Sequence, residues 1–314
     1  MSTLITGVGG FAGRHLVDAL TADGTEPIGL GRSAEPGDSL RELLRDYLRV
    51  DLRDADATRA AVAAARPELV FHLAADASVA RSWSAPADTL RNNLDSTLNL
   101  LEAVRHDAPR ARVLIAGSGE QYGVPESLPV TEDVPLRPQN PYAVSKSSAD
   151  LLAGFYADAH GLHLVRTRAF NHAGPGQSDT YVVASFARQI AEAERDGREE
   201  LDLVTGNIEV RRDFSDVRDV VHAYRLALER AEPGAYNVCS GESTRVADIL
   251  AGLANLTSLR VAQQTDPKLV REHEVMEIRG SNEKLSAATG WRPERLLETT
   301  LRDTLDWWRK RPAA

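Results

Sequence analysis

The chain has 314 residues, and its 37 Lys and Arg against 46 Asp and Glu give a formal net charge of −9. This excess of acid disfavours a nucleic-acid or anionic-membrane partner, because both attract cationic surfaces. The single cysteine, Cys239, excludes an internal disulfide, and no His, Cys, Asp and Glu spacing of metal-site type occurs. No apolar run approaches the ~18 residues of a membrane span, and no signal-peptide pattern is present. We therefore expect a cytoplasmic globular protein that needs no metal.

In chain order, short apolar runs alternate with amphipathic stretches over the first half of the sequence. The apolar runs predict strands and the amphipathic stretches predict helices. The predicted strands are 4–6, 27–30, 47–50, 69–73, 112–116 and 163–168. The predicted helices are 11–23, 55–65, 89–105 and 141–160. This alternation implies an α/β fold of Rossmann type, a doubly wound parallel sheet with helices on both faces.

The pattern changes after about Asn171. The run Gly174-Pro175-Gly176 interrupts it, and a predicted helix at 182–194 and a strand at 201–204 follow. We expect residues 1–170 to form the Rossmann-type domain and residues 171–314 to form mainly a smaller α/β lobe. A later segment, at about 205–235, is expected to return to the first domain.

Three glycines punctuate the turn between the first predicted strand and the first predicted helix. Gly7, Gly10 and Gly13 would let this turn tighten and let a pyrophosphate approach the helix N-terminus. A glycine triplet alone also occurs in ordinary turns. Its place at the first strand-to-helix turn predicts a dinucleotide site in residues 1–170.

The second predicted strand ends without an acidic residue. An acid at this point selects NAD by binding the adenosine ribose, whereas the chain has Arg32 and Ser33. Arg32 can pair with a 2′-phosphate and Ser33 can donate a hydrogen bond to it, so NADP is favoured over NAD. A solvated Arg32 is the alternative. Asp51 and Leu52 follow the third strand, where a side chain could meet the adenine, although a plain loop aspartate fits equally well.

Tyr142 and Lys146 lie four residues apart on a predicted helix and so share a face. A nearby ammonium favours the phenolate, and the same lysine could hold a ribose. Tyr142 could then exchange a proton with a carbonyl oxygen while hydride moves at the adjacent carbon. Ser118 follows the fifth strand, at the edge of the sheet where such folds bind ligands. A surface Tyr–Lys pair is the alternative, but the order of these residues after the glycine loop predicts an oxidoreductase.

The chain resembles extended short-chain dehydrogenases/reductases that act on nucleotide sugars, over nearly its whole length. The strings that carry the resemblance are 6–13, 72–75, 92–93, 118–123, 138–146 and 168–171. The strings 170–177, 212–217, 236–241 and 278–281, with 289–291, are most similar to those of reductases of GDP-4-dehydro-6-deoxy-D-mannose.

The resemblance implies NADP(H), a nucleotide diphosphate sugar as substrate, and roles for specific residues. Catalytic positions are Ser118, Tyr142 and Lys146, with Glu120 beside them. Further cofactor-binding positions are Phe11, Ala74, Ala75 and Asn93. Substrate-binding positions are Asn171, Gln177, Arg212 and Arg279, and also Val182 and Val183, for which packing in the helix core is an equal alternative. The resemblance also implies a homodimer in which helices 89–105 and 141–160 pair as a four-helix bundle.

Three functions stay open at this stage. The first is NADPH-dependent reduction of GDP-4-dehydro-6-deoxy-D-mannose to GDP-D-rhamnose. The second is a redox-neutral epimerase or 4,6-dehydratase that recycles NAD(P), since Glu120 stands where dehydratases of this superfamily carry their base; Gly119, however, offers no acid. The third is a non-catalytic NADP-binding regulator, against which the intact Ser118, Tyr142 and Lys146 argue. Net consumption of NADPH would separate the first from the others.

Overall fold

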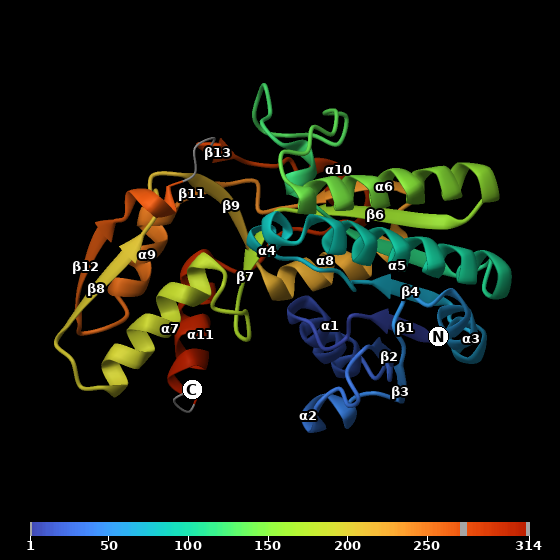
Figure 1. Ribbon diagram of the computed structural model, residues 1–314, viewed down its shortest axis with the longest axis horizontal. Coiled ribbons are helices and arrows are strands. Elements are labelled where there is room, and N and C mark those ends of the chain that lie inside the picture. The colour runs from blue at the N-terminus through green and yellow to red at the C-terminus, as the bar shows by residue number, and fades with distance from the viewer. Residues whose placement is uncertain (1, 271–274, 312–314) are drawn as a thin grey trace.

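The computed structural model describes residues 2–270 and 275–311, and a seven-stranded parallel sheet forms its centre (Figure 1). The strand order is β10-β6-β5-β4-β1-β2-β3, and every neighbouring pair is parallel. The strands are β1 (Thr3–Thr6), β2 (Ile28–Gly31), β3 (Asp46–Arg49), β4 (Leu69–His72), β5 (Arg112–Ser118), β6 (His163–Ala169) and β10 (Gly234–Val238). The central strands are buried on both sides, as a doubly wound sheet requires.

Helices cover both faces of this sheet, so the predicted fold class is confirmed. One face carries α1 (Phe11–Ala22), α2 (Asp38–Arg41), α8 (Val217–Arg230) and α10 (Glu283–Thr289). The other face carries α3 (Ala55–Ala65), α5 (Pro86–Asp107) and α6 (Pro141–His160), with the short α4 (Val79–Ser84) packed on α5 and α6. Two hydrophobic cores result, one on each face of the sheet.

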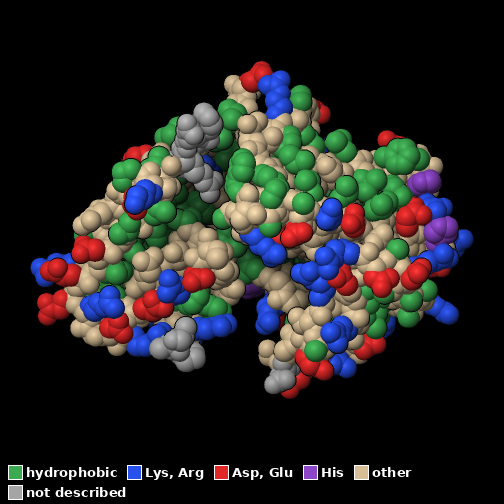
Figure 2. Space-filling model, viewed as in Figure 1, with side chains coloured by type: hydrophobic (Ala, Val, Ile, Leu, Met, Phe, Trp, Pro, Cys, Tyr) green, Lys and Arg blue, Asp and Glu red, His purple; other side chains and the backbone are tan. Residues whose placement is uncertain are grey.

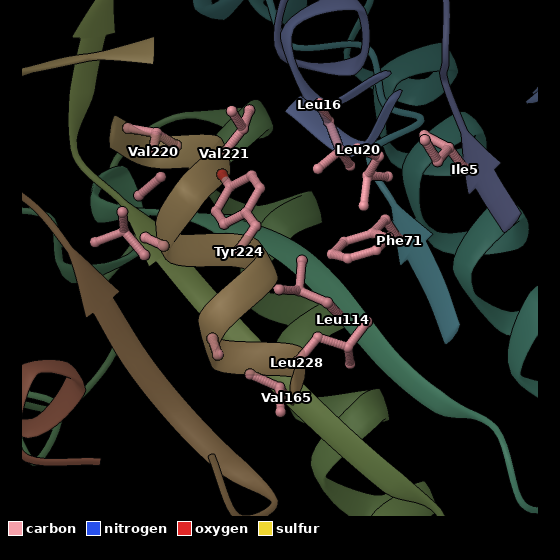
Figure 3. Close-up of a cluster of buried hydrophobic side chains, with 14 of the residues drawn as sticks. Ile5, Leu16, Leu20, Phe71, Leu114, Val165, Val220, Val221, Tyr224 and Leu228 are labelled. Carbon is pink, nitrogen blue, oxygen red and sulfur yellow. The ribbon is translucent and has the colours of Figure 1, made fainter. Parts of the chain in front are cut away.

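A late segment of the chain contributes to the first of these cores. Leu228 of α8 lies beside Leu114 and Val165 of the sheet (Figure 3), and Val221 and Tyr224 of the same helix belong to this core. Their spacing places them on one helix face, which explains why α8 packs here. The strand that follows, β10, adds the seventh strand beside β6. The boundary expected between residues 170 and 171 remains a prediction. The chain crosses between the two parts more than once, because α8 and β10 follow the first strands of the lobe and pack in the larger domain.

The second part is a smaller α/β lobe, at the left in Figure 1. Its strands are β7 (Asn171–Ala173), β8 (Glu200–Thr205), β9 (Arg211–Asp216), β11 (Ser243–Arg245), β12 (Arg260–Thr265) and β13 (Glu277–Ile278). Its helices are α7 (Val182–Arg195), α9 (Val246–Ala254) and α11 (Leu297–Arg309). These helices bury a third apolar core against β8 and β9. A space-filling view shows the surface hollowed between the lobe and the larger domain (Figure 2).

Three further structural findings bear on function. No helix among the described residues is long and apolar enough to cross a membrane. Within those residues, no group of three or more His, Cys, Asp or Glu could hold a metal ion. Cys239 is free and buried, directly after β10.

Candidate active site

A cavity of about 550 Å³ runs along the carboxyl ends of β1, β2 and β4. Eight residues that the sequence assigned to the cofactor line it: Gly7, Gly10, Arg32, Ser33, Asp51, Leu52, Ala74 and Ala75. The lining residues that the sequence did not single out include Gly9, Arg14, Glu35, Gly37, Tyr47, Asn92 and Ser96. They come from loops and from α1, β3 and α5, and only the fold brings them to this edge.

The glycine loop is shaped for close approach of the backbone. Gly7 has φ +70, and a Cβ there would lie 2.7 Å from the backbone nitrogen of Ala74. A Cβ at Gly13 would lie 2.5 Å from the carbonyl oxygen of Gly7, so this glycine lets α1 pack beneath the loop. Phe11 does not line the cavity; its ring stacks on His172, with 5.9 Å between centroids. The loop thus forms a tight turn ahead of a helix N-terminus, which suits a pyrophosphate.

The end of the cavity near Arg32, where we expect the adenosine, is charged. The carboxylate of Asp51 accepts hydrogen bonds from Arg53, and these hold the pKa of Asp51 at about 2. Arg32 Nη1 donates to Asn92 Oδ1 at 3.5 Å, and the Tyr47 hydroxyl donates to the carbonyl oxygen of Ser33 at 3.0 Å. A glycine cradle, this volume and two lining arginines fit a phosphorylated dinucleotide.

Tyr142, Lys146 and Ser118 meet at the carboxyl end of β5. Asn140 caps α6 by accepting from the backbone N–H of Ala143 at 2.8 Å, which fixes the first turn that carries Tyr142. Lys146 lies one turn later and donates from Nζ to the carbonyl oxygen of Ala116 at 2.7 Å. Ser118 hydrogen-bonds the Tyr142 hydroxyl. The three side chains that the sequence grouped are therefore neighbours.

Burial sets the protonation states of this group. It raises the pKa of Tyr142, and the hydrogen bond with Ser118 opposes that shift only in part. Burial lowers the pKa of Lys146 to about 8. Tyr142 therefore holds its proton at neutral pH, as a proton donor must, while Lys146 is cationic below about pH 8.

A buried hydrogen-bond network stands behind Ser118. Gln121 accepts from the backbone N–H of Ser118 at 2.7 Å and donates to Asp150 Oδ2 at 3.2 Å. Asp150 also accepts from Arg168 Nε at 2.9 Å and from Arg166 Nη1 at 3.0 Å. A buried carboxylate with these cationic partners is fully compensated, so the network can fix the backbone at the serine.

Glu120 lies next to the reacting group. Its Oε2 accepts from Asn140 Nδ2 at 3.0 Å, and its charge contributes to the raised pKa of Tyr142, after burial. Gly119 faces the ring of Phe170, which a Cβ at that position would approach to 3.1 Å. The loop therefore presents one carboxylate beside Tyr142, and Phe170 restricts the space for a side chain at position 119.

Asn93 has a structural task in this structure. Its Oδ1 accepts from the backbone N–H of Asp76 at 2.7 Å, and its Nδ2 donates to Ser145 Oγ at 2.8 Å. It therefore ties α5 and α6 to the loop after β4, beside the cavity rather than in its lining. His72 is also structural: its Nδ1 lies 2.8 Å from Thr6 Oγ1, and burial lowers its pKa to about 3.

The expected substrate residues lie in and beside the lobe. Asn171 is exposed, whereas Gln177 is buried and donates to the carbonyl oxygen of His172 at 2.7 Å. Arg212 on β9 and Arg279 after β13 are half-buried on paired strands. They are brought to one small sheet although they lie far apart in the sequence.

The two valines of α7 differ in their surroundings. Val183 is 1% exposed and belongs to the hydrophobic core of the lobe, which is the packing alternative that the sequence left open. Val182 is only partly buried and packs at the edge of this core. The residue before them, Tyr181, was missed by the sequence reasoning. Its hydroxyl donates to the carbonyl oxygen of Ala77 at 3.2 Å, across from the lobe to the larger domain.

A doubly wound sheet that carries a glycine loop and a Ser–Tyr–Lys group at its carboxyl edge has the architecture of extended short-chain dehydrogenases/reductases. The chain belongs to the family described as GDP-mannose 4,6 dehydratase, whose profile matches residues 4–304. It is thus an enzyme of the nucleotide-sugar branch of this class.

Relatives of different activity share the whole length of the chain. It is 37% identical to GDP-6-deoxy-D-mannose reductase from Pseudomonas aeruginosa, over 98% of this chain and 97% of that protein. It is 31% identical to UDP-glucose 4-epimerase from Mycolicibacterium smegmatis, over 99% of each. The solved structure of RMD from Pseudomonas aeruginosa in complex with NADPH matches with a TM-score of 0.86 and 35% identity, over 98% of each chain.

Proposed function

We propose that the enzyme uses NADPH to reduce a 4-keto-6-deoxy nucleotide sugar, namely GDP-4-dehydro-6-deoxy-D-mannose, to GDP-D-rhamnose. The observation that carries the proposal is a single proton-donating group, Tyr142 with Ser118 and Lys146, beside a loop whose position 119 is a glycine packed on Phe170. A ketone reduction needs one proton donor, whereas a 4,6-dehydration needs further acid and base groups near C5 and C6. The 37% identity to a GDP-6-deoxy-D-mannose reductase supports the same choice.

The residues divide the work in a simple way. NADPH, when bound, supplies the hydride. Tyr142 donates its proton to the C4 oxygen, and the Ser118 hydroxyl hydrogen-bonds that oxygen and orients it. The cationic Lys146 stabilises the phenolate that Tyr142 becomes. Arg212 and Arg279 are proposed to bind the diphosphate, to which guanidinium groups are suited. Asn171, Gln177 and Val182 are proposed as further substrate contacts.

The cofactor choice rests on the adenosine end of the cavity. Arg32 and Ser33 line it where an acidic residue would bind the ribose of NAD, so we propose NADPH rather than NADH. The Pseudomonas aeruginosa structure that matches this chain is itself a complex with NADPH.

The test is the absorbance of NADPH after purified enzyme is mixed with GDP-4-dehydro-6-deoxy-D-mannose. We expect one NADPH to be consumed per ketone reduced. No consumption by a folded protein that binds NADPH would reject the reductase. Glu120 would then be the first residue to test, because a carboxylate beside Tyr142 is the feature that favours a redox-neutral dehydratase or epimerase.

We also propose a homodimer in the cytoplasm, with α5 and α6 of each copy forming a four-helix bundle. α6 presents a stripe of exposed apolar side chains at helical spacing: Val144, Leu151 and Phe155, of which Leu151 is 64% and Phe155 60% exposed. Trp83 on α4 and Leu98 on α5, two helices that pack on α6, are also exposed. Closed two-fold pairing would bury this apolar face.

A further inference from the structure

The wall of the cofactor cavity contains two arginines. Arg14, on α1, lines the same cavity as Arg32, which follows β2. Among the residues that the structure describes, neither guanidinium forms an ion pair with a carboxylate, whereas Arg53 and Arg81 nearby each pair with an aspartate. Two cations in one wall repel each other unless an anion lies between them.

The two guanidinium groups enter the cavity from different elements. Arg14 Nε donates to the carbonyl oxygen of Gly9 at 3.1 Å, so its stem lies along the glycine loop. Its Nη2 lies 3.9 Å from the point where a Cβ on Gly37 would be. Arg32 instead reaches Asn92 on α5, and its charge contributes to the low pKa of Asp51. Arg32 therefore lies toward the adenine side, and Arg14 toward the loop at 33–37.

That loop is held in place over the cavity. Gly37 has φ +95, a conformation that favours glycine, and Pro36 is buried. The Tyr47 hydroxyl bonds the carbonyl oxygen of Ser33 and anchors the start of the loop. The lining carboxylates do not neutralise Arg14: Asp51 is paired with Arg53, and Glu35 forms no ion pair within the described part of the chain.

We propose that Arg14 binds the 2′-phosphate of NADPH together with Arg32 and is a second determinant of the preference for NADPH. The phosphate would lie between the guanidinium of Arg14 on α1 and that of Arg32 directly after β2, with Ser33 as a further donor. Arginine suits this task because its planar donors can bind two phosphate oxygens at once. The inference rests on the proposed use of NADPH.

The test compares dissociation constants of NADPH and NADH, measured by the fluorescence of the reduced nicotinamide, for four proteins: wild type, Arg14→Ala, Arg32→Ala and Arg110→Ala. We expect Arg14→Ala to weaken NADPH by ~10-fold or more and NADH by no more than ~2-fold, because only NADPH carries the extra charge. Arg32→Ala should behave similarly. Arg110, an exposed arginine at the amino end of β5, controls for the loss of one positive charge far from the cavity.

The other outcomes separate failure of this inference from failure of the proposed cofactor. If wild type binds NADPH and NADH equally well, the proposed use of NADPH is wrong. If wild type prefers NADPH but Arg14→Ala changes neither constant, or weakens both equally, the role of Arg14 at the 2′-phosphate is overturned. Arg14→Lys, which keeps the charge, should retain part of the preference; circular dichroism melting checks that each variant is folded.

Discussion

At the scale of single residues, burial keeps the proposed proton donor, Tyr142, protonated. Tyr142 and Lys146 are both buried, and the loss of water disfavours the charged form of each. The pKa of Tyr142 is therefore raised and that of Lys146 is lowered to about 8. Tyr142 is therefore protonated at neutral pH and can donate its proton to a carbonyl oxygen during reduction. Lys146 is cationic at neutral pH and can stabilise the phenolate that results.

Replacement of Tyr142 by phenylalanine should nearly abolish turnover and leave the binding of NADPH almost unchanged. Tyr142→Phe removes the hydroxyl that donates the proton but keeps the ring that packs in the site, so we expect kcat to fall by ~10²-fold to ~10⁴-fold. The dissociation constant of NADPH should change by less than ~3-fold, since general acid catalysis is lost and not binding. Near-normal turnover would remove Tyr142 from its role.

The pH dependence of kcat/KM should follow the loss of the proton from Lys146. As pH rises through about 8, Lys146 loses its proton and its charge, while Tyr142 keeps its own proton. We therefore expect kcat/KM for reduction to fall above about pH 8. In Lys146→Arg the guanidinium stays charged, so the residual activity should lack this decrease. A flat profile in wild type, or the same decrease in the variant, would contradict the assignment.

At the scale of elements, the helix α6 and the loop after β5 act as one unit. Tyr142, Lys146 and Asp150 are spaced four apart and lie on one face of α6. Tyr142 and Lys146 lie beside Ser118. Asp150 accepts a hydrogen bond from Gln121, which in turn accepts one from the backbone N–H of Ser118. A Cβ at Gly117 would lie 2.4 Å from Gln121 Oε1, so glycine there leaves room for this amide. The helix thereby positions all three side chains of the proposed catalytic group.

Removal of the hydrogen bonds of Gln121 should lower kcat without weakening the binding of NADPH. Gln121→Met keeps the size of the side chain but removes both hydrogen bonds, leaving the Ser118 N–H without its partner. We expect kcat to fall by ~10-fold, and the free energy of unfolding to fall by ~1–3 kcal/mol for the buried groups left unpaired. The NADPH dissociation constant should stay within ~2-fold of wild type, because the change lies outside the cavity wall.

A matched variant is available for this comparison. Gln189→Met alters a glutamine on α7 whose amide, among the residues that the structure describes, bonds only Ser185 of the same helix, so kcat should not change. Equal losses in kcat for the two variants would show that Gln121 acts through general stability rather than through Ser118. Loss of stability in Gln121→Met with an unchanged kcat would also exclude the positioning role.

At the scale of the whole molecule, contacts between the lobe and the larger domain shape the cleft. His15 Nε2 lies 2.8 Å from the carbonyl oxygen of Pro175, and Phe11 stacks on His172. The hydroxyl of Tyr181, just before α7 of the lobe, donates to the carbonyl oxygen of Ala77 in the larger domain. The segment that enters the lobe is therefore attached to the larger domain at several points.

The proposed dimer predicts a change of mass upon mutation. Leu151→Asp combined with Phe155→Asp puts two charges into the apolar stripe of α6, and burial of an unpaired charge is costly. We expect wild type to sediment as a dimer and the double variant as a monomer at micromolar concentration. Leu296→Asp is the control, since Leu296 is 73% exposed but lies on the lobe. A wild-type monomer would contradict the proposal.

Local patterns in the sequence determined much of this protein. The α/β alternation, the helix from Pro141 to His160 with its capping asparagine and the tight glycine turn all depend on neighbouring residues, through hydrophobic periodicity and backbone geometry. Tyr142 and Lys146 share a helix, so their pairing could be predicted from spacing alone. The strings around them carried the family, which the comparisons confirm.

Only the tertiary structure decided what lies opposite these residues. Arg14 and Tyr181 follow no local rule, because each acts on a group from another element: Arg14 on the cavity beside Gly37, and Tyr181 on Ala77. Gln121 bonds Ser118 locally in a capping box, but its bond to Asp150 on α6 depends on the fold. Likewise, Val183 packs in the lobe core because of where α7 docks. Contacts between residues far apart in the sequence depend on how the whole chain packs. The hydrophobic periodicity of a short segment therefore cannot predict them.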